Sequence, residues 1–166
     1  KVFYRFCDAC LYIGTRNREF YLAHGVPERK LFFMPYTVDN ESFAAKFDGM
    51  NPSLDVICTR LGLPSDFPII LYASKLISRK RPRDLLLAYA LLARRGIRAS
   101  LVFVGDGELL QALRDEVTSL ELSRVAFAGF INQSELPLYY SIANVLALPS
   151  EDEPWGLVIN EVMCCG

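Results

Sequence analysis

The sequence is poor in histidine and tryptophan and lacks long apolar runs. His24 and Trp155 are the only residues of their kinds among 166. With one histidine the chain offers no catalytic pair of histidines, and we expect His24 near a helix end on the surface. No apolar run is long enough to cross a bilayer, and the first residues lack the apolar stretch of a secretory signal. Because residue 1 is not Met and the sequence opens inside a pattern, we expect the natural protein to extend beyond both ends.

A large net charge is also lacking. The chain has 18 lysines and arginines against 19 aspartates and glutamates, which gives a net charge of −1. This balance argues against the broad positive surface of a nucleic-acid-binding protein. A local basic cluster lies at residues 79–83, and such a charge run is usually a solvated loop or helix start. The 52% content of hydrophobic residues supports a sizeable buried core.

The five cysteines are odd in number and scattered, so a reduced cytosol fits better than a disulfide framework. Cys7 and Cys10 form a CxxC, a spacing found in metal sites and redox pairs. In this sequence no second CxxC and no histidine cluster completes a tetrahedral site. We therefore expect ordinary buried thiols at both positions and no bound metal.

Apolar segments alternate with helical patterns along the chain. Residues 9–14 and 30–35 read as buried strands, with a helix between them that Thr15 can cap and Gly25 can end. This order is the strand–helix–strand unit of a parallel sheet. The more polar residues 36–52 are expected to form an irregular connector.

A regular alternation follows, after a short helix expected from Ser53 to Leu61. The predicted strands are 67–74, 98–105, 124–130 and 144–150, and the predicted helices are 81–96, 107–122, 134–143 and 156–166. Near-continuous apolar strands between amphipathic helices predict an α/β fold, a Rossmann-like parallel sheet with helices on both faces. Ligands of such sheets bind outside the carboxyl ends of the strands, so functional residues should follow Ser74, Gly105, Gly129 and Ser150.

The segment EDEPWGLVINE (151–161) is the first candidate site. Glu153 lies after a predicted strand, and Gly156 opens a helix whose free N–H groups suit a phosphate. Glu161 lies one turn beyond Leu157, so two carboxylates could accept hydrogen bonds from sugar hydroxyls near that helix start. The alternative is a helix-start glutamate and a solvated glutamate. Trp155, between them, could wall a pocket or simply pack.

Two further loops carry candidates. Lys75 and Lys80 could reach a diphosphate from one loop. The alternative is that this basic loop is solvent-exposed and binds no ligand. Gly105 and Gly107 bracket Asp106, either as a tight turn or as a close backbone approach to a ligand. The spacing is not GxGxxG, so a dinucleotide fingerprint is not supported.

Taken together, these segments resemble the retaining GT-B glycosyltransferases of the group 1, or family 4, type. The resemblance runs in order along nearly the whole chain, through MPYTVDNESF, YASKLISRKRP, LVFVGDGEL, VAFAGFINQSELPLYYSIANVLALPS and EPWGLVINEVMCCG. It implies an incomplete GT-B fold, with residues 1–45 as the end of the N-terminal acceptor domain and connector. Residues 46–166 would be the first part of the C-terminal nucleotide-sugar-binding domain.

The resemblance also implies roles for individual positions. Lys75 and Lys80 would bind the donor diphosphate, and Glu153 would contact the donor sugar. Glu161 would bind the ribose hydroxyls. Backbone groups near three further residues would meet the phosphates, sugar and base: Gly156, Leu157 and Phe130. Members of this type need no metal ion or other cofactor, because basic side chains and the helix start neutralise the leaving nucleoside diphosphate.

The implied activity is transfer of a hexosyl group from a nucleotide-diphosphate sugar to a saccharide or lipid-linked hydroxyl acceptor, with retention. The expected setting is the cytoplasm, with peripheral contact to the inner membrane face through the missing domain. Three side chains depart mildly from the family pattern: Ser74, Val162 and Cys164. Because the family continues beyond both ends of this chain, we expect the fragment alone to be inactive. A non-catalytic nucleotide-binding module and a nucleotide-sugar epimerase on a related fold remain alternatives, and the basic loop fits the epimerase less well.

Overall fold

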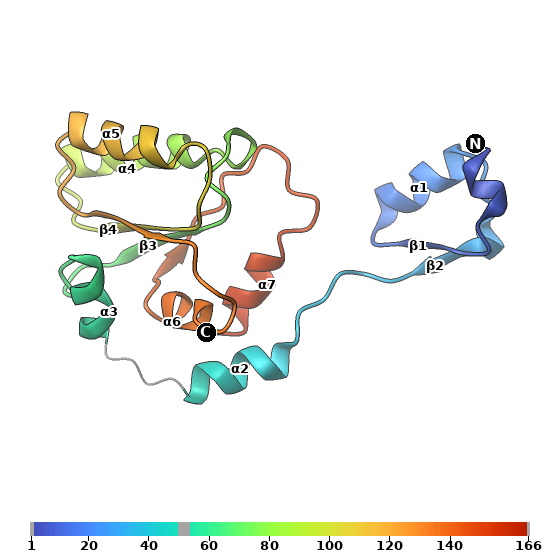
Figure 1. The fold of residues 1–166 in the computed structure, drawn as a ribbon, viewed down its shortest axis with the longest axis horizontal. Helices are drawn as coiled ribbons and strands as arrows, with labels where there is room; N and C mark the ends of the chain where they lie inside the picture. The colour runs from blue at the N-terminus through green and yellow to red at the C-terminus, as the bar shows by residue number, and fades with distance from the viewer. Residues whose placement is uncertain (1, 50–53, 166) are drawn as a thin grey trace. The chain divides into compact units, whose positions relative to one another are not determined.

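The computed structural model describes residues 2–49 and 54–165. The chain divides into two compact units, Lys1–Val38 and Asp39–Gly166, which are shown in one ribbon in Figure 1. Within the described residues, no helix combines the length and the apolar character needed to cross a membrane.

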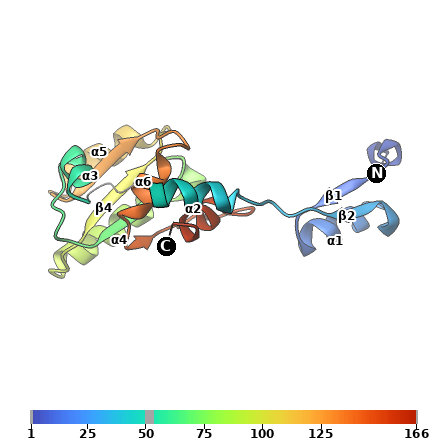
Figure 2. The same ribbon diagram turned by 90° about the horizontal axis from the view of Figure 1, so that it is seen from below.

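The first unit is a strand–helix–strand unit, as predicted. Strand β1 (Cys10–Tyr12) pairs in parallel with β2 (Leu31–Phe33), and helix α1 (Thr15–Ala23) connects them (Figure 2). Two 3-10 helices, Phe3–Phe6 and Glu28–Lys30, precede the two strands.

Two local expectations in this unit have different outcomes. The predicted cap at Thr15 is wrong, because Gly14 is the N-cap residue and no side chain caps the helix. The predicted end is confirmed: His24 is the C-cap and Gly25 follows with φ 82°. The Cys10 thiol is buried as expected, whereas Cys7 is only half-buried, and both are free.

The second unit begins with a helix that the sequence did not predict. Residues 36–52 were expected to be irregular, but α2 covers Asn40–Gly49 and contacts α6. Its first turn is closed by the Phe43 amide, which donates to the Asp39 carbonyl at 3.0 Å. Phe43 is 3% exposed and joins the main core, so it anchors this helix to the second unit. Helix α3 (Leu54–Leu61) follows, close to its predicted range.

A four-stranded parallel sheet forms the body of this unit, in the order β5-β4-β3-β6. Its strands are β3 (Ile69–Ala73), β4 (Ser100–Val104), β5 (Val125–Gly129) and β6 (Val145–Leu146). The helices that alternate with them are α4 (Pro82–Arg94), α5 (Leu110–Ser119), α6 (Leu136–Ser141) and α7 (Leu157–Met163). The predicted α/β fold is confirmed, although β6 is much shorter than the predicted 144–150.

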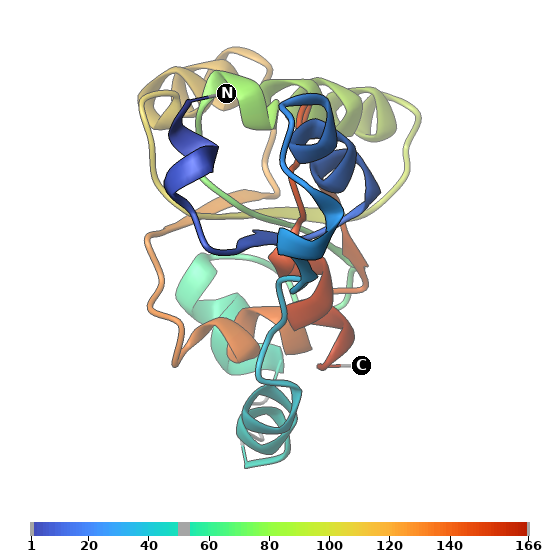
Figure 3. The same ribbon diagram turned by 90° about the vertical axis from the view of Figure 1, so that its right-hand side faces the viewer.

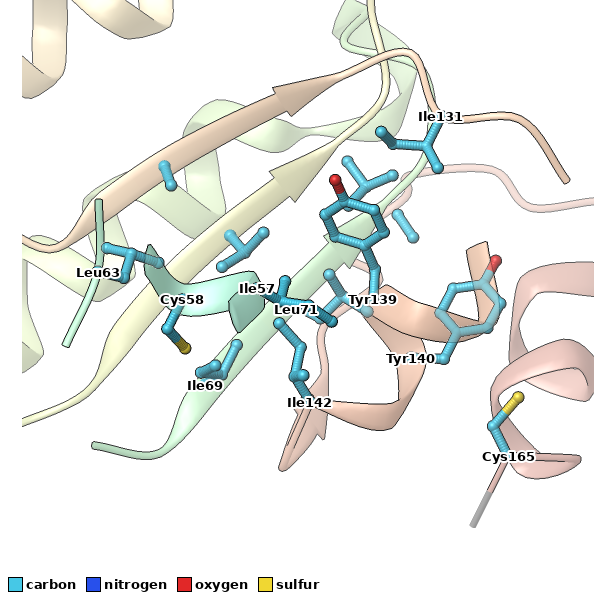
Figure 4. Close-up of a cluster of buried hydrophobic side chains, with 14 of the residues drawn as sticks. Ile57, Cys58, Leu63, Ile69, Leu71, Ile131, Tyr139, Tyr140, Ile142 and Cys165 are labelled. Atoms are coloured by element: carbon cyan, nitrogen blue, oxygen red, sulfur yellow. The ribbon is translucent and has the colours of Figure 1, made fainter. Parts of the chain in front are cut away.

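The sheet buries both of its faces, which explains why its strands are largely apolar. Figures 1 and 3 show α4 and α5 over one face and α3 and α6 over the other. On the first face Tyr72 and Phe103 pack with residues of α4 and α5. On the second face Leu71 packs with Ile57 of α3 and with Ile142, the C-cap of α6 (Figure 4). Alternate residues of each strand therefore enter different cores.

The loops that follow β3 and β4 approach each other at backbone distance. The Leu76 amide donates to the Asp106 carbonyl at 2.9 Å. A Cβ placed on Gly105 would lie 2.0 Å from the Ser74 carbonyl oxygen, and one on Gly107 would lie 2.5 Å from that of Leu76. The two glycines are therefore needed for a tight turn against the neighbouring loop.

We predict that Gly105→Ala lowers the midpoint of thermal unfolding of the full-length protein by about 6–12 °C, from backbone collision and the φ of 132° together. Gly96→Ala is the matched control, because Gly96 has a φ of 74° but nothing within 4 Å of the added Cβ. Only backbone strain acts there, so we expect the midpoint of thermal unfolding to fall by about 2–4 °C. Equal shifts in calorimetry would show that the loops do not constrain each other.

Candidate functional site

A cavity of about 400 Å³ opens at the carboxyl edge of the sheet. Residues directly after three strands line it: Ser74 and Lys75 after β3, Gly105 and Asp106 after β4, and Phe130 and Ile131 after β5. Parts of α6 and α7 close it with Leu136, Tyr140, Val158 and Glu161. Because parallel strands place their carboxyl ends at one edge, the loops after these three strands converge as the sequence predicted.

Three of the predicted site residues lie on this cavity: Lys75, Phe130 and Glu161. Lys75 is exposed, so its ammonium group stays hydrated while its stem borders the cavity. Phe130 is 75% exposed, which leaves its ring open to a planar ligand.

The Glu161 carboxylate is held by a residue that sequence reasoning missed. The Tyr140 hydroxyl donates to Glu161 Oε2 at 2.7 Å, and Tyr140 is 4% exposed. Burial raises the pKa of Tyr140, and the hydrogen bond and charge of Glu161 raise it further, so the phenol stays protonated and donates. Neighbouring Tyr139 is also buried, and the sequence holds no signal that separates these two tyrosines of α6.

A second cluster of predicted site residues forms in the adjacent loops. Lys80 forms an ion pair with Glu153, and the Ser150 hydroxyl donates to the same carboxylate oxygen at 3.0 Å. The Lys80 and Glu153 side chains are only 12% and 26% exposed. Gly156 lies against them, since a Cβ there would be 3.3 Å from Glu153 Cγ. The lining of the cavity includes none of these residues, nor Leu157, so the predicted residues form two neighbouring groups.

The rest of the basic cluster is paired as well. Arg81 Nη2 lies 2.8 Å from the Glu151 carboxylate, and Arg79 Nη1 lies 3.9 Å from that of Asp152. The Arg79 and Arg81 side chains are 50% and 43% exposed and lie just before α4, which agrees with the expected solvated loop or helix start. Three consecutive basic residues nevertheless face three consecutive acidic ones. The reason is the strand order: β6 pairs with β3, which brings the loops that follow them together.

The environment of Glu153 favours its charged form. Partial burial alone would raise the pKa of Glu153, but hydrogen bonds from Lys80 and Ser150 and the charges of Lys80 and Arg79 outweigh it. The net result is a pKa below the ordinary value of 4.5. The carboxylate is thus ionised at neutral pH and already has a cationic partner.

The remaining candidates lie outside these two groups. Within residues 2–49 and 54–165 there is no group of three or more histidine, cysteine, aspartate and glutamate side chains that could hold a metal ion. His24 lies at the end of α1, with its Nδ1 atom 2.7 Å from the Phe20 carbonyl oxygen. Trp155 is half-buried and does not line the cavity.

We predict that the stability advantage of wild type over Glu153→Gln shrinks as the pH falls. A carboxylate whose pKa is lower in the folded state stabilises that state above pH 4.5 and loses this effect as the pH falls through its folded pKa. Thermal unfolding of both proteins between pH 7 and pH 3 measures this difference. Glu151→Gln, in the same loop but with a 61% exposed side chain, should change the midpoint little at any pH. If the difference in thermal midpoint between wild type and Glu153→Gln stays constant with pH, the ion pair of Glu153 with Lys80 does not stabilise the fold.

Comparison with known proteins identifies relatives of this chain. A mannosyltransferase of Mycolicibacterium smegmatis, described as GDP-mannose-dependent and acting on phosphatidylinositol monomannoside, is 28% identical over 96% of this chain and 42% of its own length. The D-inositol 3-phosphate glycosyltransferase of Kineococcus radiotolerans is 31% identical over 91% of this chain and 36% of its own. The chain therefore spans well under half the length of these relatives.

Solved structures show the same fold. Anabaena HepE in complex with UDP superposes with a TM-score of 0.73 at 21% identity, over 97% of this chain and 43% of its own. Sucrose-phosphate synthase of Thermosynechococcus elongatus gives a TM-score of 0.70 at 29% identity, over 96% of this chain and 39% of its own. Residues 57–166 match the family described as glycosyl transferases group 1. The chain belongs to the group 1 glycosyltransferases and has part of their GT-B fold.

Proposed function

We propose that the protein transfers a hexosyl group from a nucleotide-diphosphate sugar to a hydroxyl acceptor with retention, and that the cavity at the carboxyl edge of the sheet binds the donor. The observation that carries this proposal is the convergence of Lys75, Phe130 and the oriented Glu161 carboxylate on one cavity. The nucleotides in the relatives support it: the mannosyltransferase is described as GDP-mannose-dependent, and HepE has been solved with UDP and with UDP-glucose.

In this proposal Glu161 recognises the ribose. A carboxylate accepts a pair of hydrogen bonds from vicinal hydroxyl groups, and Tyr140 already fixes its orientation through one oxygen. The base would lie toward Phe130, where backbone groups give it hydrogen-bonding partners and the exposed ring borders it. Both contacts would anchor the part of the donor that does not react.

The two lysines would neutralise the diphosphate. As the bond from the sugar to the diphosphate breaks, negative charge grows on the leaving oxygen, and fixed cations stabilise it. Lys75 borders the cavity, and Lys80 lies in the adjacent cluster, paired with Glu153. An incoming diphosphate competes with Glu153 for Lys80, which turns that carboxylate toward the donor sugar. With two ammonium groups in these roles, the proposal requires no metal ion or other cofactor.

The acceptor side of the proposal rests on the part of the protein outside the second unit. We propose that the first unit is the end of the acceptor domain and that a saccharide or lipid-linked acceptor binds there. The two compact units meet between Val38 and Asp39, a few residues before the predicted boundary at residue 45, so in this proposal α2 belongs with the donor-binding part. We also propose that the protein is cytoplasmic and contacts the inner membrane face. Residues 1–166 alone are expected to be inactive.

We predict that the full-length protein binds one of UDP, GDP and ADP in calorimetric titration, and that Glu161→Ala weakens this binding about 100-fold or more. Two hydrogen bonds to a charged group are lost in that variant. Glu116→Ala is the matched control, because Glu116 also holds a partner, Arg83, but on the α4–α5 surface. Its nucleotide affinity should equal that of wild type.

The same preparation tests the reaction. Incubation with the matching nucleotide hexose and a panel of saccharide and lipid-linked acceptors should give a product with the donor's anomeric configuration, read by NMR. Binding without transfer would favour a non-catalytic nucleotide-binding module. Binding of none of the three nucleotides would contradict the proposed function.

A further inference from the structure

A buried hydroxyl lies directly beneath the loop that carries both lysines. Tyr72 is on β3 with 0% exposure, and its ring packs against Phe103 with 5.3 Å between ring centroids. Its hydroxyl donates to the Lys75 carbonyl at 2.8 Å, and the Lys80 carbonyl oxygen lies 3.5 Å from the same atom. One side-chain atom thus contacts the backbone at both ends of the loop.

The contact with the Tyr72 hydroxyl constrains the backbone conformation of the 75–80 loop. Lys75 and Lys80 are five residues apart, and their carbonyl groups converge on a single hydroxyl only because the loop folds back on itself. Inside the loop the Ile77 amide donates to the Lys75 carbonyl, and the Lys80 amide donates to the Ile77 carbonyl, both at 3.0 Å. These bonds are local, whereas Tyr72 ties the loop to the rigid sheet.

We propose that Tyr72 is a positioning residue of the donor site: its hydroxyl fixes the backbone of the 75–80 loop so that the two ammonium groups can meet one diphosphate. This inference rests on the proposed function, because it assigns a purpose to the loop that the donor would contact. Tyr72 itself does not line the cavity, so its effect passes through the loop.

The protonation state of Tyr72 suits this role. Burial raises the pKa of Tyr72; a hydrogen bond with the Ser74 side chain lowers it in part, and the charge of Glu153 raises it. The net shift is upward, so the hydroxyl keeps its proton at physiological pH and donates throughout.

Tyr89 provides a matched control within the same core. Its hydroxyl donates to the carbonyls of Ala99 and Arg124, at 2.9 and 3.1 Å, and the side chain is 3% exposed. Those carbonyls precede β4 and β5, at the edge of the sheet opposite the cavity. Tyr89→Phe therefore removes the same kind of bond as Tyr72→Phe, but far from the lysines.

The experiment compares both variants with wild type in the full-length protein. Calorimetry measures affinity for UDP, GDP and ADP and for the corresponding nucleosides, and hydrogen exchange measures the amides of Ile77, Lys80 and Arg81. For the nucleotide that wild type binds, Tyr72→Phe should lower diphosphate affinity about three- to tenfold and leave nucleoside affinity unchanged. It should also speed exchange in the loop. Tyr89→Phe should lower the thermal midpoint similarly and change neither readout.

Each other outcome is decisive. Wild-type diphosphate affinity and exchange in Tyr72→Phe would overturn the positioning role while leaving the proposed function standing. Equal loss of diphosphate and nucleoside affinity, or the same loss in Tyr89→Phe, would show a general effect on stability and overturn it too. If wild type binds no nucleoside diphosphate, the proposed function fails, and the inference that rests on it fails with it.

Discussion

The parallel pairing of β3 with β4 on one side and β6 on the other is the constraint on which the site depends. It places the loop that follows β3 between the loops of its two neighbours. The glycine turn after β4 then packs against Ser74 and Leu76 at backbone distance. From the other side, the acidic loop after β6 pairs with residues 79–81. Tyr72 holds the same loop from below. Together these contacts give the basic loop that follows β3 a defined backbone conformation.

The charges of this region are balanced before any ligand arrives. Lys80 and Glu153 neutralise each other in a partly buried position, where an unpaired charge would be costly. In the proposed function a diphosphate would bring negative charge to a cation that already has a partner, so its binding would exchange one ion pair for another. The pairing holds residues 79–81 against the loop that follows β6. It also links the carboxylate proposed to contact the sugar with the lysine proposed to contact the phosphate.

The regular part of the fold could be predicted from the sequence, because strands buried on both faces are largely apolar, as Ile69–Ala73 and residues 101–104 are. Helix α2 was missed because its residues are mostly polar or small, and the contact of Phe43 with the core depends on the tertiary fold. The bond from Tyr140 to Glu161 and the pairing of 79–81 with 151–153 were also missed. These contacts depend on strand order and helix packing, which bring together residues 21 to 73 positions apart. The positions of Lys75 and Phe130 on one cavity follow from strand direction, whereas Glu161 reaches it through the packing of α7. The roles of all three toward a donor stay predictions.

The most direct test of the account is a crystal structure of the full-length protein with the nucleoside diphosphate that it binds. The account predicts density for the ribose beside the Glu161 carboxylate and for the diphosphate within reach of both the Lys75 and Lys80 ammonium groups, with the Lys80–Glu153 pair opened or shared. A nucleotide bound elsewhere, or one whose diphosphate lies away from the 75–80 loop, would contradict it.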